Sequence, residues 1–157
     1  MSDPIVHSAH RLSTSSDVKL MGVDDKLVAV VRRAIEITKV DFGVSEGVRT
    51  VETQRKYVAA GKSQTMESKH IPGHAVDLIA YVDGQVSWEL NLYDDIADAM
   101  KQAATELGVK IRWGGAWTVP DIRAWNGTMQ EAMNSYIDAK RKEGKRPFID
   151  GPHFELN

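Results

Sequence analysis

The residues best suited to chemistry lie in two short clusters that are far apart in the sequence. The first runs from Ser68 to Asp77, and its last residue sits inside an apolar segment. Strand interiors disfavour aspartate, and a half-buried carboxylate needs a cation or a metal as its partner. Pro72 and Gly73 can turn the chain so that His70 returns beside Asp77. One nitrogen and one oxygen donor suit zinc, while a loop histidine next to a capping aspartate is the alternative.

The second cluster, which runs from Asp150 to Glu155, contains an acid three residues before a histidine. In a regular strand, residues three apart face opposite sides of the sheet. Gly151 and Pro152 break this alternation and can bring Asp150 and His153 to one face. An acid beside a histidine ligand is what metal-assisted hydrolysis requires, because the metal polarises a carbonyl and the carboxylate takes a proton. A turn followed by an edge strand is the alternative.

Four further side chains near these clusters have less specific interpretations. His74 lies four residues after His70, as in a helical metal pair, but the proline and glycine between them argue against a helix. His7 and His10 belong to a polar segment and are expected to be solvated. Glu155 is expected either to support the nearby histidine or to form an ion pair.

The elements that must hold these clusters are a mixture of helices and strands. Asp83-Gly84 is a strong hairpin signal, and glycines at 61, 108 and 144 mark the ends of helices. We interpret the pattern as an α+β fold with a small antiparallel sheet and helices packed on it. Apolar periodicity and capping residues predict helices at 24–39, 50–60, 92–107 and 128–143, and strands at 40–44, 75–82, 85–88 and 109–113, with 147–156 extended.

Length and composition limit the class of protein. The chain has 157 residues, no cysteine and a formal net charge of -2. This length suits a single domain spanning 1–157, with 1–22 as a polar leader. The absence of cysteine excludes a thiol nucleophile, and the near-neutral charge argues against non-specific nucleic-acid binding. Neither a signal peptide nor a membrane span is recognisable, so we expect synthesis in the cytoplasm.

Taken together, the two clusters resemble a known enzyme family. The pattern S-x-H-x-x-G-x-A-x-D at 68–77, followed by D-x-x-H at 150–153, is similar to that of zinc peptidases of the D-Ala-D-Ala carboxypeptidase type. This family includes phage L-alanyl-D-glutamate endopeptidases, which serve as endolysins. Residues 44–50 resemble its strand-end segment with an active-site arginine, and residues 111–117 resemble the Trp-Gly-Gly segment of the endolysin branch. The resemblance implies the fold shared with the hedgehog signalling domain.

The resemblance implies a role for each residue that matches the family's motifs. His70, Asp77 and His153 match three ligands of one zinc ion per chain, with a fourth position left open. Asp150 matches the acidic general base. Many relatives have glutamate at this position, so the shorter Asp150 side chain must lie closer to the attacking water.

The same resemblance extends to two residues outside the metal set. Arg49 matches the arginine that polarises or orients the scissile carbonyl, which is an oxyanion-type role. The alternative for Arg49 is an ion pair with Glu46 or Glu52. Ser68 precedes the first ligand and is expected to contact the substrate or the ligands.

Two tryptophans bear on the choice between an endopeptidase and a carboxypeptidase. Trp113 and Trp117 flank Gly114-Gly115 and are expected to line a substrate groove, with packing in the core as the alternative. A carboxypeptidase must hold a terminal carboxylate with a cation close to the metal. Arg49 is already assigned to the scissile carbonyl, and no second cation can be assigned from the sequence. An endopeptidase needs an open groove instead, and the segment 113–117 is expected to form one wall of it. We therefore expect an endopeptidase.

The resemblance thus implies a zinc-dependent phage endolysin that hydrolyses the L-alanyl-D-glutamate bond of peptidoglycan and promotes host lysis. The alternatives are a D,D-carboxypeptidase or dipeptidase on D-Ala-D-Ala termini, and a non-catalytic zinc-containing module that binds the wall. Asp150 argues against the last, because a structural zinc needs no base beside it. We expect a monomer without stable membrane association or a nucleic-acid partner. It is expected to act on peptidoglycan in the periplasm after release from the host cytoplasm.

Overall fold

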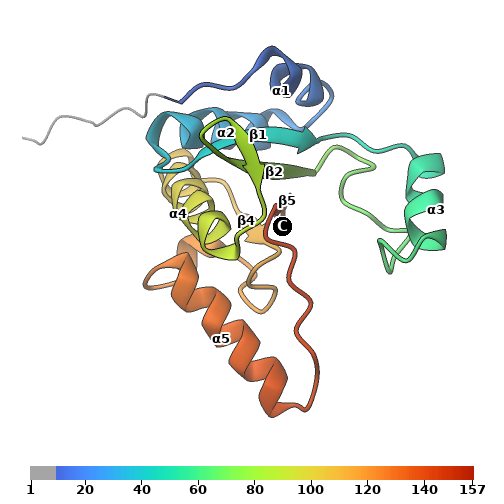
Figure 1. Cartoon of the computed structure of the whole chain (residues 1–157), viewed down its shortest axis with the longest axis vertical. Helices are drawn as coiled ribbons and strands as arrows, with labels where there is room; N and C mark the ends of the chain where they lie inside the picture. The colour runs from blue at the N-terminus through green and yellow to red at the C-terminus, as the bar shows by residue number, and fades with distance from the viewer. Residues whose placement is uncertain (1–9) are drawn as a thin grey trace, which may run out of the picture.

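An antiparallel sheet forms the centre of the computed structural model, which describes residues 10–157 (Figure 1). One edge of β2 pairs with β1, and its other edge is shared by β5 at residues 75–77 and β3 at residues 80–82. The central pair β2–β5 therefore joins two segments that are distant in sequence. The strands lie in the order β1 (Asp41–Glu46), β2 (Ala75–Val82), β5 (His153–Leu156) and β4 (Ile111–Trp113), and β3 (Gln85–Ser87) pairs with β2.

The two faces of the sheet differ sharply in polarity. Along β2, Val76, Leu78 and Ala80 are fully buried, and Phe154 of β5 lies beside Val76 on the same face. Asp77 points to the opposite face, because successive residues of a strand alternate. The apolar face forms the core, which leaves the other face to carry polar side chains.

Helices cover the apolar face of this sheet. α2 and α4 pack against each other, and their buried residues join those of β1, β2 and β5 in one core. Thr128 begins α5 with a reciprocal capping box, and Gly108 ends α4 in a left-handed conformation. The helices are α1 (Thr14–Lys19), α2 (Asp25–Ile37), α3 (Val51–Ala59), α4 (Leu90–Leu107), the 3₁₀ turn η1 (Ile122–Ala124) and α5 (Met129–Lys142).

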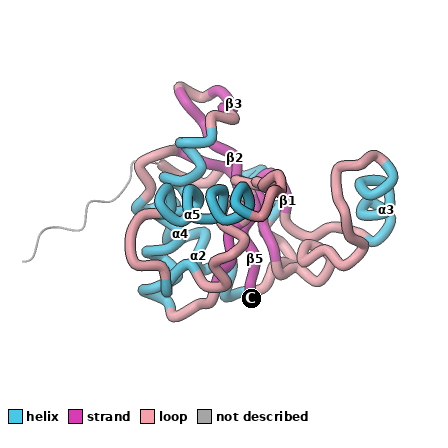
Figure 2. The backbone as a smooth tube through the Cα atoms, turned by 90° about the horizontal axis from the view of Figure 1, so that it is seen from below, coloured by secondary structure: helices cyan, strands magenta, loops and turns pink. Residues whose placement is uncertain are grey.

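α3 stands away from the other helices in both views of the molecule (Figures 1 and 2). Thr50 caps its first turn by accepting a hydrogen bond from the backbone of Thr53. Gln54 is the buried residue of this helix, and its side chain bonds to the loop that follows, at Ser63 and the carbonyl of Thr65. α3 is therefore held mainly by polar contacts with its own connecting segments.

The α+β architecture and the antiparallel sheet confirm the fold class expected from the sequence. α1 was not anticipated, because the polar segment in which it lies has no apolar period. It is ordered by a distant contact: the buried Ser16 hydroxyl accepts a hydrogen bond from Val44 N at 2.9 Å. His10 lies 3.7 Å from Asp41, with 33% of its side chain exposed, and His7 lies outside the described residues. Among residues 10–157, no helix is long and apolar enough to cross a bilayer.

Candidate active site

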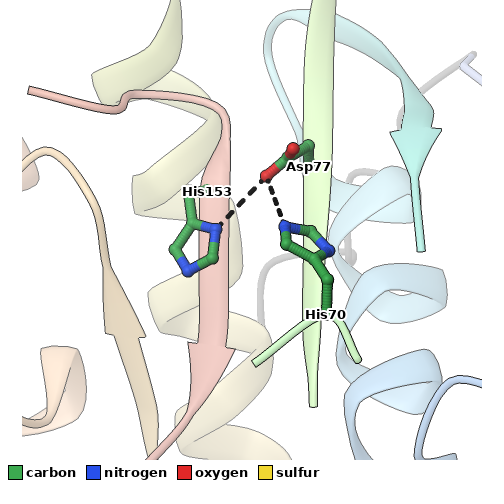
Figure 3. A group of neighbouring side chains, drawn as sticks. All are labelled: His70, Asp77 and His153. Carbon is green, nitrogen blue, oxygen red and sulfur yellow. Dashed lines mark hydrogen bonds and ion pairs between the residues drawn. The ribbon is translucent and has the colours of Figure 1, made fainter. Parts of the chain in front are cut away.

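Three side chains meet on the polar face of the sheet. One donor atom each from His70, Asp77 and His153 lies within 4.8 Å of the others. Asp77 Oδ1 is 3.2 Å from His70 Nε2 and 3.3 Å from His153 Nδ1, so the carboxylate faces both imidazoles (Figure 3). Two nitrogens and one oxygen form a donor set that can hold a metal ion and leave one position open.

The backbone explains how distant residues reach this cluster. His153 is the direct cross-strand partner of Asp77, because β5 pairs with β2. His70 returns through the turn expected at Pro72-Gly73, which the Gly73 N–H closes by donating to the His70 carbonyl at 3.2 Å. Gly73 has a positive φ of 77°, and a Cβ there would lie 2.5 Å from the carbonyl oxygen of Gly22. Only glycine fits this turn without a clash.

The ring nitrogens that point away from Asp77 have fixed partners. The Gly47 carbonyl lies 2.8 Å from His70 Nδ1 and accepts a hydrogen bond from its N–H, which turns Nε2 toward the cluster. Glu155 Oε1 lies 2.8 Å from His153 Nε2 and plays the same part for that ring. This arrangement orients histidines as metal ligands. The two interpretations of Glu155 therefore meet in one contact, because its ion-pair partner is the histidine itself.

The contacts within the cluster stabilise a negative charge on Asp77 and a positive charge on His153. Burial alone would raise the pKa of Asp77, but hydrogen bonds from His153 and His70 lower it overall. Burial alone would lower the pKa of His153, but its bonds to Asp77 and Glu155 raise that pKa to about 9. Without a bound cation, His153 is therefore protonated on both ring nitrogens and positively charged at neutral pH. A metal ion would take the place of the proton that faces Asp77.

Asp150 lines the same cavity but is not part of the three-residue cluster. Burial, and then the negative charge of Asp77, raises the pKa of its carboxyl group. Its backbone is anchored on both sides, since Asp150 N donates to Gly114 O at 2.8 Å and Asp150 O accepts from His153 N at 3.1 Å. A Cβ on Gly114 would lie 2.3 Å from the Asp150 carbonyl oxygen, so a glycine is required here. A carboxylate with a raised pKa is suited to accepting a proton.

Arg49 is held in a defined position next to the cluster. Its Nη2 bonds to Glu46 Oε2 at 2.7 Å, and its Nη1 donates to Gln54 Oε1 at 2.6 Å and Ser68 Oγ at 3.3 Å. The guanidinium also lies 4.5 Å from the centre of the Tyr57 ring. Burial lowers the pKa of Arg49, but the bond and charge of Glu46 outweigh it and raise that pKa. The ion pair with Glu46 is thus present, and it aligns the guanidinium beside the cavity.

A cavity of about 750 Å³ opens over the cluster. Trp117 lies on one side of it, with its ring 5.5 Å from the His153 ring and stacked on Phe148 at 6.4 Å. Ser68 also lines the cavity, as does Trp117. Further lining residues come from the α3 side, namely Glu46, Arg49, Tyr57 and residues 62–65 and 67–69, and from the sheet side, namely Arg112, Asp150 and Glu155.

Trp113 does not line this cavity, which corrects the expectation from the sequence. Its side chain is fully buried in the core, stacks on Phe154 at 6.3 Å and donates from Nε1 to the Gly151 carbonyl at 2.7 Å. The physical reason is the alternation of β4, which turns Trp113 to the core and Arg112 to the cavity. Sequence reasoning missed Arg112, because the three residues of β4 are too few for a local alternation to show which side chain faces the cavity.

Comparisons with known proteins agree with this site. Residues 8–157 match the family model for phage L-alanyl-D-glutamate peptidase. The L-alanyl-D-glutamate peptidase of Escherichia phage T5 is 33% identical over 150 residues, which cover 93% of this chain and 97% of the phage protein. That of Listeria phage A118 is 29% identical over 97 residues, covering 60% of this chain and 34% of the phage protein.

A solved structure shares the fold over nearly the whole chain. The crystal structure of the Serratia marcescens L-Ala D-Glu endopeptidase ChiX is similar with a TM-score of 0.69 and 38% sequence identity. The match covers 94% of this chain and 90% of that protein. Fold similarity and sequence similarity therefore point to the same group of proteins.

Proposed function

The chain belongs to the phage L-alanyl-D-glutamate peptidase family, and we propose that it hydrolyses the L-alanyl-D-glutamate bond of peptidoglycan with one zinc ion. The observation that carries the proposal is the cluster of His70, Asp77 and His153, whose donor atoms lie within 4.8 Å of one another in the floor of a cavity. Family membership makes the protein a peptidase, and the cluster supplies the place where the chemistry occurs.

The residues present fit zinc. Two imidazole nitrogens and one carboxylate oxygen form a common catalytic zinc set, and each imidazole is oriented by an acceptor on its far nitrogen, Gly47 O for His70 and Glu155 for His153. When bound, zinc supplies a Lewis acid that polarises the scissile carbonyl and lowers the pKa of the attacking water. Asp150 lines the same cavity as the three donors, which supports a role for it in this chemistry.

Two further residues act on the substrate in this proposal. Asp150 accepts a proton from the attacking water and passes it to the amino group of D-glutamate as that group leaves. Arg49 donates to the oxygen of the scissile carbonyl and stabilises the charge that develops there. Its contacts with Glu46, Gln54 and Ser68 occupy four of its five N–H groups, which leaves one on Nη2 for the substrate.

The remaining contacts and the setting follow from the same proposal. Ser68 and Trp117, which both line the cavity, contact the stem peptide on either side of the scissile bond. The protein works as a monomer on peptidoglycan in the periplasm, after release from the cytoplasm of the host.

Mass spectrometry of purified muropeptides tests this function. Incubation with the zinc-loaded protein is expected to leave L-Ala on the muramic acid and to create new amino termini on D-Glu. A chelator should stop the reaction, and added zinc should restore it. Release of D-Ala or of the D-Ala-D-Ala dipeptide as the main product would instead favour a carboxypeptidase or dipeptidase. New reducing sugar ends would exclude a peptidase, and no product at all would favour the non-catalytic module.

A further inference from the structure

A second arginine lies beside the metal cluster, on the side away from Arg49. In the strand order β1-β2-β5-β4, Arg49 follows β1 and Arg112 belongs to β4, while Asp77 and His153 lie on β2 and β5 between them. Both arginines line the same cavity. A substrate that crosses the sheet over the cluster therefore meets a guanidinium on each side.

Arg112 is fixed in place but still has donors available. Its Nε donates to the Trp117 carbonyl at 3.0 Å, and its Nη2 bonds to the same oxygen. The guanidinium lies 5.2 Å from the Trp117 ring. Glu155 is its cross-strand neighbour, but the contact of Glu155 is with His153, and Arg112 acts on Glu155 only through its charge. Within residues 10–157, Nη1 of Arg112 has no hydrogen-bond partner.

The cavity continues past Arg112 into a second hollow of about 610 Å³. Arg112, Trp117 and Phe148 line both spaces, so the stacked aromatic pair forms the passage between them. Lys140 is the other charged residue of the hollow, where it also lies 3.6 Å from Glu143. Two cations and no acid line the hollow, which suits an anionic chain. Its lining is completed by Thr118, Pro120 and Tyr136.

The proposed substrate has an anionic group at the matching position. Glutamate has two carboxyl groups, and only one can form the next amide bond of the stem. The other is a free carboxylate on the residue whose amino group leaves. We propose that the guanidinium of Arg112 binds this carboxylate of D-glutamate, and that the rest of the stem continues over Trp117 and Phe148 toward Lys140. This subsite rests on the proposed function. It assigns the side of the cavity next to β4 to the part of the stem peptide that begins at D-glutamate and leaves after cleavage.

Two muropeptides that differ in one group test the subsite. One carries the free carboxylate on D-glutamate, and the other carries a carboxamide at that position. The wild-type protein is expected to cleave the amidated substrate with a kcat/KM about ten- to hundredfold lower, as for the loss of one charge-assisted hydrogen bond. Arg112→Gln should cleave both substrates at the low rate and so lose the discrimination. Arg112→Lys should recover part of it, because the charge remains but the planar fork is lost.

Matched measurements separate recognition from a purely structural role. Arg141→Gln removes an exposed arginine of α5 that lines neither space, and it should keep the full discrimination. Equal cleavage of both substrates by the wild type would overturn the subsite. An equal loss of kcat/KM on both substrates in Arg112→Gln and Arg112→Lys would also overturn it. Arg112 would then have only a structural role, as the donor to the Trp117 carbonyl.

If the protein cleaves neither substrate, that result counts against the proposed function but not against the Arg112 subsite. The subsite is then tested by binding. Calorimetry with the same two muropeptides should then show tighter binding of the acid by the wild type and equal binding by Arg112→Gln. Equal binding of the acid and the amide by the wild type would overturn the subsite. Zinc content and a thermal melt of each variant establish that the site and the fold are intact.

Discussion

The cavity has one wall made of the sheet and the turn that carries His70, and another made of α3 and residues 61–69 that follow it. On the sheet wall, His70 and His153 are only 2% and 8% exposed, and their polar atoms have defined partners. On the α3 wall, most residues of 61–69 are exposed, and Gln54 is the buried residue of the helix. The two walls thus differ in how firmly their side chains are held.

This difference matches the two tasks of a metallopeptidase. Donor atoms for a small ion must keep their separation to within a few tenths of an ångström. Strand register fixes Asp77 and His153 relative to each other, and the Pro72-Gly73 turn fixes His70. A wall that receives a peptide must admit a larger and more variable partner, and segments with few buried apolar contacts open at low cost. We therefore expect substitutions of the three donors and of Glu155 to change metal binding, and substitutions of Asp150 or of residues on the α3 wall to change turnover while the metal stays bound.

The largest effect is expected from His153→Ala on the sheet wall. Removal of one of three donors should empty the zinc site and abolish lysis, whereas the wild type should hold about one zinc per chain. His74→Ala is the matched control, because His74 lies near the cluster but outside it, and this variant should keep its zinc. Elemental analysis and a lysis assay measure both outcomes. Full lytic activity of His153→Ala at trace zinc would exclude His153 as a ligand.

Asp150→Asn should retain zinc and the fold but lose about 10²–10⁴ in kcat, the usual contribution of a general base. The side chain keeps its size and loses only the ability to accept the proton. Zinc content and turnover measured on the same preparation separate the two effects. Loss of zinc would make Asp150 a ligand, and near-normal turnover would place the base elsewhere.

Arg49→Ala tests the α3 wall and should lower kcat by about 10²–10³ with zinc still bound. The loss should appear in kcat more than in KM, because the arginine acts on charge that develops during the reaction. Arg49→Lys should rescue little, since lysine lacks the planar fork that pairs with Glu46. A lower melting temperature with an unchanged rate per folded molecule would instead reduce Arg49 to an ion-pair partner.

Glu155→Gln should weaken zinc binding by about 10–100-fold, the usual cost of losing a carboxylate that orients a histidine ligand. Glu155 touches His153 at 2.8 Å but is not one of the three donors. Glu67→Gln makes the same chemical change in the exposed segment of the α3 wall and should leave zinc affinity unaltered. Competition with a chromophoric chelator gives both affinities. Equal affinities for the two variants would remove the distinction between the walls.

A change of one pH unit between pH 7 and pH 9 should give the smallest effect, about tenfold in zinc affinity. The pKa of His153 in the metal-free protein is raised to about 9, above its ordinary value, so the proton is bound below that pH and competes with zinc. Affinity should therefore rise with pH and level off above pH 9. Chelator competition at several pH values, corrected for the chelator, measures the slope. A flat profile would show that His153 is already neutral at pH 7.

Local signals in the sequence predicted most elements but not their mutual positions. The alternation of residues 75–82 and the Asp83-Gly84 turn predicted β2 and its hairpin, and both turn residues have positive φ, 51° and 76°. Thr50 and Thr128 cap the two helices expected to begin at residues 50 and 128. These signals act within a few residues of themselves, so they survive in any tertiary context.

The site depended on contacts that no local signal contains. Spacing alone left His153 and Asp77 unconnected, because their proximity arises from the pairing of β5 with β2, and only the family resemblance joined them. β4 is three residues long, too short for its alternation to show which of Arg112 and Trp113 faces the core. That choice is made by pairing with β5, where Trp113 lies opposite Phe154.

The late position of β5 in the chain has a consequence for biosynthesis. β5 lies between β2 and β4 in space, but its residues are made after those of both neighbours. A ribosome-bound chain carries His70 and Asp77 long before His153 has been added, and the two halves of the sheet cannot join until then. Long-range pairings of this kind also form slowly in folding. The metal cluster therefore cannot form before β5 has been synthesised, so a growing chain stays inactive until that point.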